Sequence, residues 1–320
     1  MKTEILEHLT PITEEEKRIL EGQTDIDRSI YMDGNEDRIN SKKLLAEGRM
    51  ITVRPHTRFV RFPAHSHDYV EVIYMCQGTT THIINGNEIT LKAGELLFLT
   101  PNATQEILPA GKNDIAVNFI ILPSFFENAV GMIGHEQTPL HKFLIDILSG
   151  TAKGTSYMHF EVADILPVQN LVENLIWTLL YKVPNKRNIN QSTMGLLLLN
   201  LLNHTDRVAG DSDDKLMLSV LQYIENNYKD GSLTELSANL HYDLAWLSRE
   251  IRLRSGKTYT ELLQEKRLSQ AEFLLKYTDM RIADIAEETG YDNISYFHRL
   301  FRSNTGSSPK KYRDKMQIKT

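Results

Sequence analysis

The sequence of 320 residues contains a single cysteine, Cys76, which lies within an apolar run. One thiol excludes a disulfide framework or a multi-cysteine zinc site within the chain, and it favours a reducing compartment. Long apolar runs are also scarce, because the longest, Met194–Leu202, is interrupted by Asn200 and is too short to span a bilayer. Residues 1–10 have two glutamates and no apolar core, so no secretory signal is predicted. We therefore expect a cytoplasmic protein with no membrane partner.

An overall excess of basic charge is missing as well, since the formal net charge is −6. Taken alone, this charge argues against nucleic-acid binding. The charge is nevertheless unevenly distributed. From Lys215 onward the chain holds 17 of the 36 Lys and Arg and 14 of the 42 Asp and Glu, a net +3, which leaves −9 for the residues before it. Such asymmetry supports a C-terminal domain that faces nucleic acid.

Changes in hydrophobic period divide the chain into five segments. Thr13 and Glu16 form a capping-box pattern that predicts an early helix. Strand periodicity then extends to Leu122, and Asn85-Gly86 between two β-rich runs predicts a hairpin. The fold class is therefore α+β. The predicted domains are an N-terminal helical arm (1–50), a compact antiparallel β-barrel or sandwich (51–125), a helical segment (126–206), a polar linker (207–215) and an all-α domain (216–320).

The helical segment contains two apolar stripes and one helix, Met194–Leu202, that is apolar nearly all round. Burial against the strand domain of the same chain and burial in a two-fold interface both remain open for this helix. We expect a homodimer formed through residues 126–206. The stripes are Leu140, Phe143, Leu144, Ile147 and Leu148, and Leu171, Leu175, Ile176, Leu179 and Leu180.

Two copies of one helix-turn-helix pattern occupy the last hundred residues. The first runs from Leu233 to Gly256 and the second from Ile282 to Gly306. The offset is 49 residues up to the tyrosine of each turn and 50 residues after it. Each copy is a short amphipathic helix, a tight break and a second helix that ends in glycine. Two copies in register, each with arginine on the outer face of its second helix, indicate DNA binding.

The second helix of each copy has an inward and an outward face. Leu247 and Ile251, like Phe297 and Phe301, are spaced i, i+4 and are expected in the core. Arginine can bind guanine O6 and N7 together, whereas Ser and His can contact bases or phosphates. For any one arginine, a merely solvated position on a helical bundle stays an alternative. The predicted DNA contacts are Ala245, Ser248, Arg249, Arg252, Ile294, Ser295, His298, Arg299 and Arg302, with Lys310, Lys311 and Arg313 as phosphate contacts.

The spacing between the copies suits two adjacent segments of the major groove. Thr258–Thr278 is predicted to be one helix of about 20 residues, roughly 30 Å long. Successive major-groove faces on one side of DNA repeat at about 34 Å. One chain could therefore place both second helices in the groove.

Several motifs in this region resemble the signature of AraC-type (AraC/XylS) transcription regulators. The resemblance covers residues 216–315 and implies a seven-helix DNA-binding domain with two helix-turn-helix units. Three positions depart from the family pattern: Ile251 stands where an aromatic is usual, Arg281 where a capping Ser is common and His241 where glycine is usual. The motifs are Ile282–Tyr291, Ser295–Phe301, Gly306 and Ser308–Arg313.

The strand domain carries a second resemblance, to cupin barrels. His65-Ser-His67 followed by Glu71 is similar to their first motif, whose residues bind a divalent metal together with a further histidine; Gln105 stands where that histidine would fall. Imidazole and carboxylate suit Fe, Mn, Ni or Zn, so His65, His67 and Glu71 are metal candidates, although we expect no metal. In AraC-type regulators the same barrel generally senses a small molecule. A polar effector pocket and purely structural hydrogen bonding are the alternatives. The pocket candidates are His65, His67, Glu71, Tyr74, His82 and Gln105, which His56, Arg58 and Arg61 could join.

The two resemblances predict a transcription regulator rather than an enzyme. A cupin-like barrel would sense an effector, for which the family suggests a sugar, and the C-terminal domain would bind promoter DNA. RNA polymerase is a further expected partner if the protein is an activator, and no cofactor is expected. The alternative is a metal-dependent cupin enzyme fused to a DNA-binding domain, which stoichiometric metal together with turnover would favour.

Overall fold

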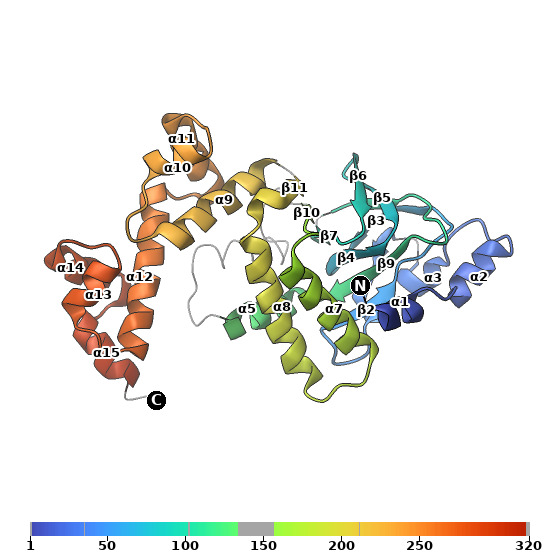
Figure 1. The fold of residues 1–320 in the computed structure, drawn as a ribbon, viewed down its shortest axis with the longest axis horizontal. Coiled ribbons are helices and arrows are strands. Elements are labelled where there is room, and N and C mark those ends of the chain that lie inside the picture. Colours follow the sequence, from blue (N-terminus) through green and yellow to red (C-terminus); the bar gives the residue numbers. More distant parts are fainter. Residues whose placement is uncertain (1, 35, 102, 134–156, 211, 318–320) are drawn as a thin grey trace. The chain divides into compact units, whose positions relative to one another are not determined.

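The computed structural model describes residues 2–34, 36–101, 103–133, 157–210 and 212–317. The chain forms two compact units, an N-terminal one that extends to Lys215 and a C-terminal one that begins at Leu216 (Figure 1). Each unit has its own layers of secondary structure and is described by itself. No helix in the described ranges combines the length and the apolar character needed to cross a membrane.

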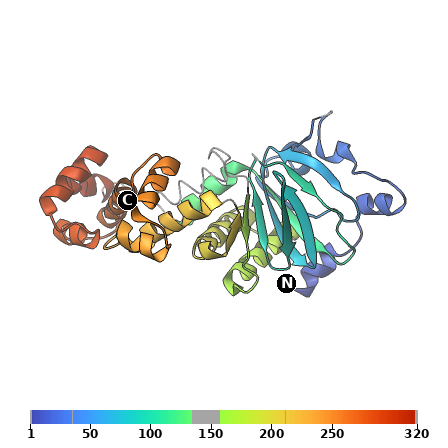
Figure 2. The same ribbon diagram turned by 90° about the horizontal axis from the view of Figure 1, so that it is seen from above.

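Two β-sheets form the centre of the N-terminal unit (Figure 2). Neighbouring strands are antiparallel except for the parallel pair β1–β3, which confirms the predicted antiparallel β fold. One sheet has the order β1 (Arg38–Ile39), β3 (Phe62–His67), β8 (Gln105–Ile107), β5 (Thr79–Ile84) and β6 (Asn87–Lys92). The other has the order β11 (Val208–Gly210), β10 (Tyr157–Phe160), β7 (Leu96–Leu99), β4 (Val70–Gln77), β9 (Ile115–Ile121) and β2 (Ile51–Pro55).

The predicted hairpin joins β5 to β6. Asn85 and Gly86 both have positive φ, 48° and 86°, as a two-residue turn of type I′ requires. Ile84 pairs with Asn87 across the turn, which fixes the register of the two strands. Side chains of the sheet interiors, among them Ile73, Met75 and Leu91, pack into one buried apolar cluster.

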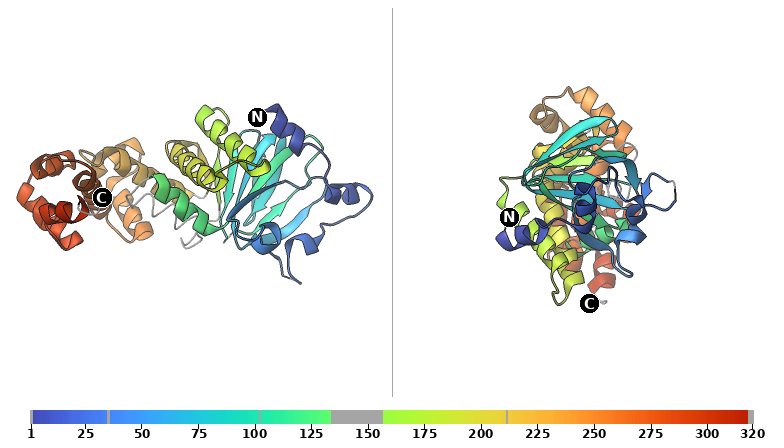
Figure 3. Two further views of the ribbon diagram at one scale, coloured as in Figure 1. Left: turned by 90° about the horizontal axis from the view of Figure 1, so that it is seen from below. Right: turned by 90° about the vertical axis from the view of Figure 1, so that its right-hand side faces the viewer.

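Helices cover the outer side of the six-stranded sheet (Figure 3). α7 and α8 pack against each other, and α5 packs against α8. α1 contacts β9, and α7 contacts the edge strand β2. The bounds are α1 Thr3–Leu9, α2 Glu14–Leu20, α3 Arg28–Tyr31, α4 Ser41–Leu44, α5 Pro123–Ile133, α7 Leu166–Leu180 and α8 Lys186–Leu202, with a short 3-10 turn at Thr205–Arg207.

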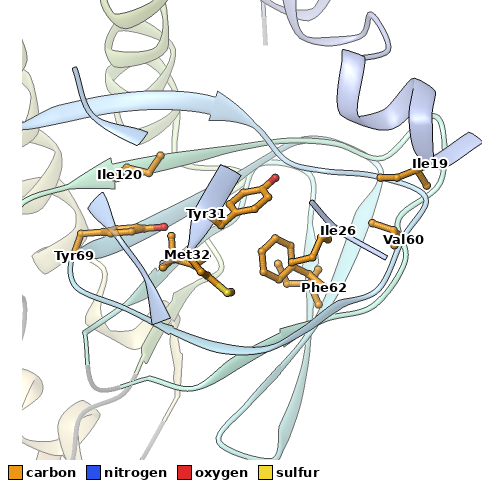
Figure 4. Close-up of a cluster of buried hydrophobic side chains, with 10 residues drawn as sticks. Ile19, Ile26, Tyr31, Met32, Val60, Phe62, Tyr69 and Ile120 are labelled. Atoms are coloured by element: carbon orange, nitrogen blue, oxygen red, sulfur yellow. The ribbon is translucent and has the colours of Figure 1, made fainter. Parts of the chain in front are cut away.

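The N-terminal arm closes one end of the β-structure through an apolar and an ionic contact. Tyr31 and Phe62 meet edge to face at 5.0 Å within a cluster of buried arm and strand residues (Figure 4). The predicted capping box of Thr13 and Glu16 is confirmed at the start of α2. The same Glu16 is fully buried and accepts bonds of 2.7 and 2.9 Å from the Arg58 guanidinium, so α2 is attached to the loop before β3.

The segment after residue 125 differs from the prediction in two respects. β10 interrupts the expected helical segment 126–206, because Tyr157–Phe160 pairs with β7. The expected linker 207–215 is wrong in form, since Val208–Gly210 pairs with β10 and α9 begins at Ser212. The apolar stripe from Leu140 to Leu148 lies outside the described residues. The Met194–Leu202 helix is buried largely within its own unit, with Leu196 exposed.

The C-terminal unit consists of seven helices in its described part, the number that the family resemblance implies. The bounds are α9 Ser212–Asn227, α10 Leu233–Asn239, α11 Leu244–Ser255, α12 Tyr259–Tyr277, α13 Ile282–Glu288, α14 Ile294–Thr305 and α15 Pro309–Gln317. Ser232 caps α10, and its spacing to Glu235 is that of a capping box, but the Glu235 side chain accepts the Tyr223 hydroxyl instead of completing one. Thr258 and Glu261 do form one, at the start of α12.

Candidate DNA interface and effector cavity

α11 and α14 are built alike from their first to their last residue. The caps Asp243 and Asn293 accept backbone bonds of 2.9 and 3.0 Å from the third residue of each helix. Gly256 and Gly306 end the helices in the left-handed region, with φ of 72° and 75°. The predicted inward residues Leu247, Ile251, Phe297 and Phe301 have no exposed surface. The duplicated sequence therefore gives duplicated local structure.

The outward face of each helix carries the predicted contact residues. Ala245, Ser248, Arg249 and Arg252 on α11 and Ile294, Ser295, Arg299 and Arg302 on α14 are exposed, as are Lys310 and Lys311, while His298 is half-buried. Within the described part of the chain, Arg249, Arg252 and Arg302 make no ion pair or side-chain hydrogen bond. Arg299 lies over the Tyr296 ring, 5.5 Å from its centroid. Unpaired guanidinium groups on capped, exposed helices suit contact with an anionic partner.

Arg313 differs from the other predicted contacts. Its guanidinium is partly buried and donates a 2.6 Å bond to the Met280 carbonyl. This bond attaches α15 to the loop before α13. Arg313 therefore has a role within the fold, and a phosphate contact would compete with it.

The turns of the two helix-turn-helix units are held in place by different contacts. In the second unit Tyr291 is buried, and Arg267 lies over its ring at 5.4 Å. In the first unit Tyr242 is 45% exposed and stacks on Trp246 with a centroid distance of 4.6 Å. His241 occupies the left-handed region at φ 57°, where the family favours glycine. Of the three departures noted in the sequence, His241 therefore lies in the less anchored turn, whereas Ile251 lies within α11 and Arg281 precedes α13.

α12 joins the two helix-turn-helix units as one continuous helix. Its 19 residues correspond to about 29 Å of helix, close to the roughly 34 Å repeat of the major groove. The predicted helix Thr258–Thr278 is confirmed, with Thr258 and Thr278 as its caps.

Inside the N-terminal unit, polar side chains form a continuous chain, here called the barrel cluster: His65, His67, Glu71, Asn118, His56, His82 and Gln105. His56 Nδ1 lies 2.9 Å from Asn118 Oδ1, and Asn118 Nδ2 donates to Glu71 Oε1 at 2.9 Å. The His56 and His82 rings lie 5.6 Å apart, and His82 Nδ1 lies 2.9 Å from Gln105 Nε2. At the other end, the His65 and His67 rings are in edge contact at 4.9 Å. All seven side chains are buried.

Burial keeps the barrel cluster neutral. It lowers the pKa of His56 and of His65 to about 4, and lowers those of His67 and His82 well below the usual range. Burial also raises the pKa of Glu71 to about 7. The 3.6 Å separation of His67 Nε2 and Glu71 Oε2 is too long for a hydrogen bond. At pH values below about 7 the cluster is therefore a set of neutral donors and acceptors, and Glu71 ionises above that pH.

Several of these donors and acceptors have no partner in the described structure: His56 Nε2, both ring nitrogens of His67, Glu71 Oε2 and Gln105 Oε1. An unsatisfied buried polar atom costs about 1–3 kcal/mol. Beside the cluster lies a cavity of about 20 Å³, lined among others by Tyr31, His56, His65, Glu71 and Asn118, which is room for about one water molecule. The interior therefore has unpaired hydrogen-bonding atoms, but its cavity is too small for a molecule much larger than water.

Not every predicted pocket residue lies in this cluster. Tyr74 is on the opposite face of β4, where its hydroxyl donates to Gln169 of α7 at 2.6 Å. Arg58 is paired with Glu16, and Arg61 pairs with Glu106 near the surface. Asn118 was not foreseen, although a lone amide in the apolar strand Ile115–Ile121 is an informative signal.

Among the residues that the structure describes, no group of three or more His, Cys, Asp or Glu side chains is placed to hold a metal ion. His65 Nδ1 is engaged by the Pro63 carbonyl at 2.7 Å. The arrangement therefore does not fit the metal centre that the first cupin motif suggests.

Part of each unit matches a known family. Residues 236–315 match the family described as a helix-turn-helix domain, and residues 48–138 match the AraC-like ligand binding domain. The chain is 26% identical to the HTH-type transcriptional activator RhaS of Yersinia pseudotuberculosis, over 80% of this chain and 90% of that protein.

Solved structures with similarity include the C-terminal domain of AraT, a response regulator from Geobacillus stearothermophilus. It is 32% identical over 31% of this chain and 84% of that chain, with a TM-score of 0.30. Apo ToxT from Vibrio cholerae is 15% identical over 84% of this chain and 98% of that chain, with a TM-score of 0.37.

Proposed function

We propose that the chain is an AraC-type transcription regulator that activates promoters to which both of its helix-turn-helix units bind. The observation that carries the proposal is the pair of equivalent helices, α11 and α14, each with exposed arginines and an apolar inner face. Activation is supported by the RhaS relative, whose name describes a transcriptional activator. RNA polymerase is then a partner, and the cytoplasm is the compartment in which the protein acts.

In this proposal the outward residues divide into two groups. Ala245, Ser248 and Arg249 on α11, and Ile294, Ser295, His298 and Arg299 on α14, contact base edges. Arg252, Arg302, Lys310 and Lys311 contact phosphates. Arg313 is left out of both groups, because its bond to the Met280 carbonyl supports a role in packing.

Arg249→Ala and Arg299→Ala test the two-groove arrangement on a site selected from random DNA. Each should weaken specific binding by about 1–3 kcal/mol and relax base preference at its own positions. Those positions should lie about 10 to 10.5 base pairs apart. Lys310→Ala is the control, because a phosphate contact weakens binding about equally on all sequences. Loss of protection over the same base pairs in both arginine variants would contradict the arrangement.

The barrel cluster is the proposed effector site. Its neutral hydrogen-bonding groups fit an uncharged molecule with several hydroxyl groups, so a sugar is the candidate class. The cavity of about 20 Å³ must enlarge for such a ligand, so ligand binding and conformation are coupled. A ligand that binds the opened form better shifts the population toward it, and DNA affinity changes by linkage.

The effector is identified by screening sugars for a rise in the midpoint of thermal unfolding of the full chain. His67→Ala should remove the response, because both ring nitrogens of His67 are buried without a hydrogen-bond partner and a sugar hydroxyl could bind them. Tyr74→Phe is the matched control from the outer face of β4 and should keep it. Equal responses in the two variants would argue against the cluster as the ligand site.

We further propose that the barrel works without a metal ion and without enzymatic turnover. A chelator should then leave the midpoint of unfolding and the DNA affinity unchanged. Loss of operator binding on chelation, restored by one divalent ion, would instead favour a metal-dependent cupin fused to a DNA-binding domain.

The proposed dimer forms through α7 and α8. These helices expose Leu166, Trp177 and Leu196 by 67%, 38% and 46%, an apolar set that is costly in a monomer. Sedimentation of a fragment should show a dimer at micromolar concentration. The fragment should end at residue 210, because ending at 206 would remove β11 from the sheet. A strictly monomeric fragment would contradict this interface.

A further inference from the structure

A second cleft lies outside the barrel, where α8 begins. It has a volume of about 220 Å³ and shares no residue with the barrel cluster. Its apolar floor comes from three elements, with Met50 and Ile51 at the start of β2, Phe125 of α5 and Leu179 of α7. Ile51 and Phe125 are buried, so the floor belongs to the packed interior of the unit. Its size is just below the roughly 300–1,000 Å³ of pockets that hold drug-sized ligands.

The rim of this cleft is cationic. Arg49, Lys186 and Arg187 all line it. Within the described ranges, none of the three faces a carboxylate at ion-pair distance; the Lys186 ammonium donates only to the Leu179 carbonyl, at 3.0 Å. Partial burial and the charge of Arg49 lower the pKa of Lys186, and no acidic group opposes the shift. Arg49 and Lys186 therefore repel each other, and no carboxylate at ion-pair distance compensates the repulsion.

The helix itself adds to this positive potential. Lys186 and Arg187 occupy the first turn of α8, where the macrodipole is positive and acidic residues are the stabilising ones. The residue before them, Asn185, has φ 53° and makes no side-chain cap bond. Cations in an uncapped first turn oppose the stability of the helix by themselves. Their presence around an apolar cleft is explained if a negative group completes the site.

We propose that this cleft binds a small amphipathic anion, a molecule with an apolar body and one carboxylate or phosphate group. The body would lie on Met50, Ile51 and Leu179, and the anionic group would face Arg49, Lys186 and Arg187. A shallower hollow of about 570 Å³ shares Arg49, Leu179 and Lys186 with the cleft, so a ligand longer than the cleft could extend into it. The proposal is independent of the effector site in the barrel.

The test is titration of the full chain at low salt, by calorimetry, with phenylacetate, hexanoate and phenyl phosphate. Phenylacetamide and hexanamide are the uncharged counterparts. Saturable millimolar or tighter binding of at least one anion is expected, with its amide much weaker. Lys186→Glu and Arg187→Glu should each weaken that binding on the order of tenfold, about 1.4 kcal/mol. Lys92→Glu, at an exposed lysine of β6 that lines neither hollow, should not.

A substitution on the floor gives an independent result. Leu179→Trp should fill the cleft and reduce binding while Lys186 and Arg187 are kept. Far-ultraviolet circular dichroism verifies that each variant is folded. The proposal is overturned if none of the three anions saturates, if the amides bind equally well, or if Lys92→Glu weakens binding as much as the cleft variants do.

Discussion

The turn of the second helix-turn-helix unit should tolerate no side chain at Gly290. This residue has φ 78°, and a Cβ atom added to it would lie 2.4 Å from the Lys229 carbonyl oxygen and 2.8 Å from the Arg267 guanidinium. Arg267 donates to the Tyr228 and Lys229 carbonyls at 2.7 and 2.8 Å. Gly290→Ala must therefore displace backbone and disturb the bonds that join α12 to the end of α9.

Gly306 provides the matched comparison. It has nearly the same φ, 75°, but a Cβ added there meets no atom within 4 Å. Gly306→Ala should therefore lower the free energy of unfolding only by the cost of placing alanine in the left-handed region, about 1 kcal/mol. Gly290→Ala has this cost as well and also weakens at least one hydrogen bond of a charged donor, worth about 1.5–3 kcal/mol. We expect a total of about 2.5–4 kcal/mol for Gly290→Ala.

The difference is measured by urea unfolding of the full chain. Trp177→Phe is used as the background, because the chain has two tryptophans and Trp246 then reports on the C-terminal unit alone. Gly290→Ala should lower the midpoint far more than Gly306→Ala. If the two free energies of unfolding agree within about 0.5 kcal/mol, the close approach of the turn to Lys229 does not hold in solution.

Three further predictions concern the cavity, the first turn and the DNA contacts. Burial raises the pKa of Glu71 from 4.5 to about 7, so the stability that its protonated form provides is complete below 4.5 and is lost as pH rises through 7. Between about pH 5 and pH 8, the free energy of unfolding of Glu71→Gln should rise above that of the parent protein by up to about 3 kcal/mol. Thermal unfolding of the two proteins as a function of pH measures this, and parallel profiles would refute it. His241→Gly should stabilise by about 1 kcal/mol in urea, because φ 57° then carries no penalty, and a destabilised variant would contradict it. Leu244 and Ile294, the first residues of α11 and α14, are 43% and 41% exposed and should contact thymine methyl groups, so uracil in place of thymine should cost about 0.8 kcal/mol per methyl. If replacing thymine by uracil weakens binding of the Leu244→Ala and Ile294→Ala variants as much as it weakens binding of the parent protein, these contacts do not exist.

Local signals account for the parts of the fold that the sequence could predict. Asn85-Gly86, the Thr13 cap and the i, i+4 core pairs of both recognition helices each depend on neighbours within a few residues. β10 and β11 could not be predicted in this way, because Tyr157–Phe160 and Val208–Gly210 are strands only through pairing with distant β7 and with each other. Strand propensity is decided by such context.

The barrel site was predictable in part. His65, His67, Glu71 and Gln105 follow from the motif, but the motif does not say which face of β4 looks inward. Period-2 alternation does: if Glu71 faces the interior, Ile73 and Met75 do too, and Tyr74 must face α7. Asn118 required knowledge of the β4–β9 register, which pairs Ile73 with Asn118 and so places its amide beside Glu71.

Both helix-turn-helix units are attached to α9, the helix that follows β11 in the chain. β11, the last strand of the N-terminal unit, is followed after one residue by α9. The end of α9 leads into the Tyr228 and Lys229 carbonyls that hold Arg267, and Gly290 of the second turn packs on the same carbonyl. Lys266 adds a 2.5 Å ion pair to Glu225 of α9. The second helix-turn-helix unit, although later in sequence, is therefore attached to α9, as is the first, whose Glu235 accepts the hydroxyl of Tyr223 of α9. A displacement of α9 would act on α13 and α14 through a contact that leaves no space for a methyl group.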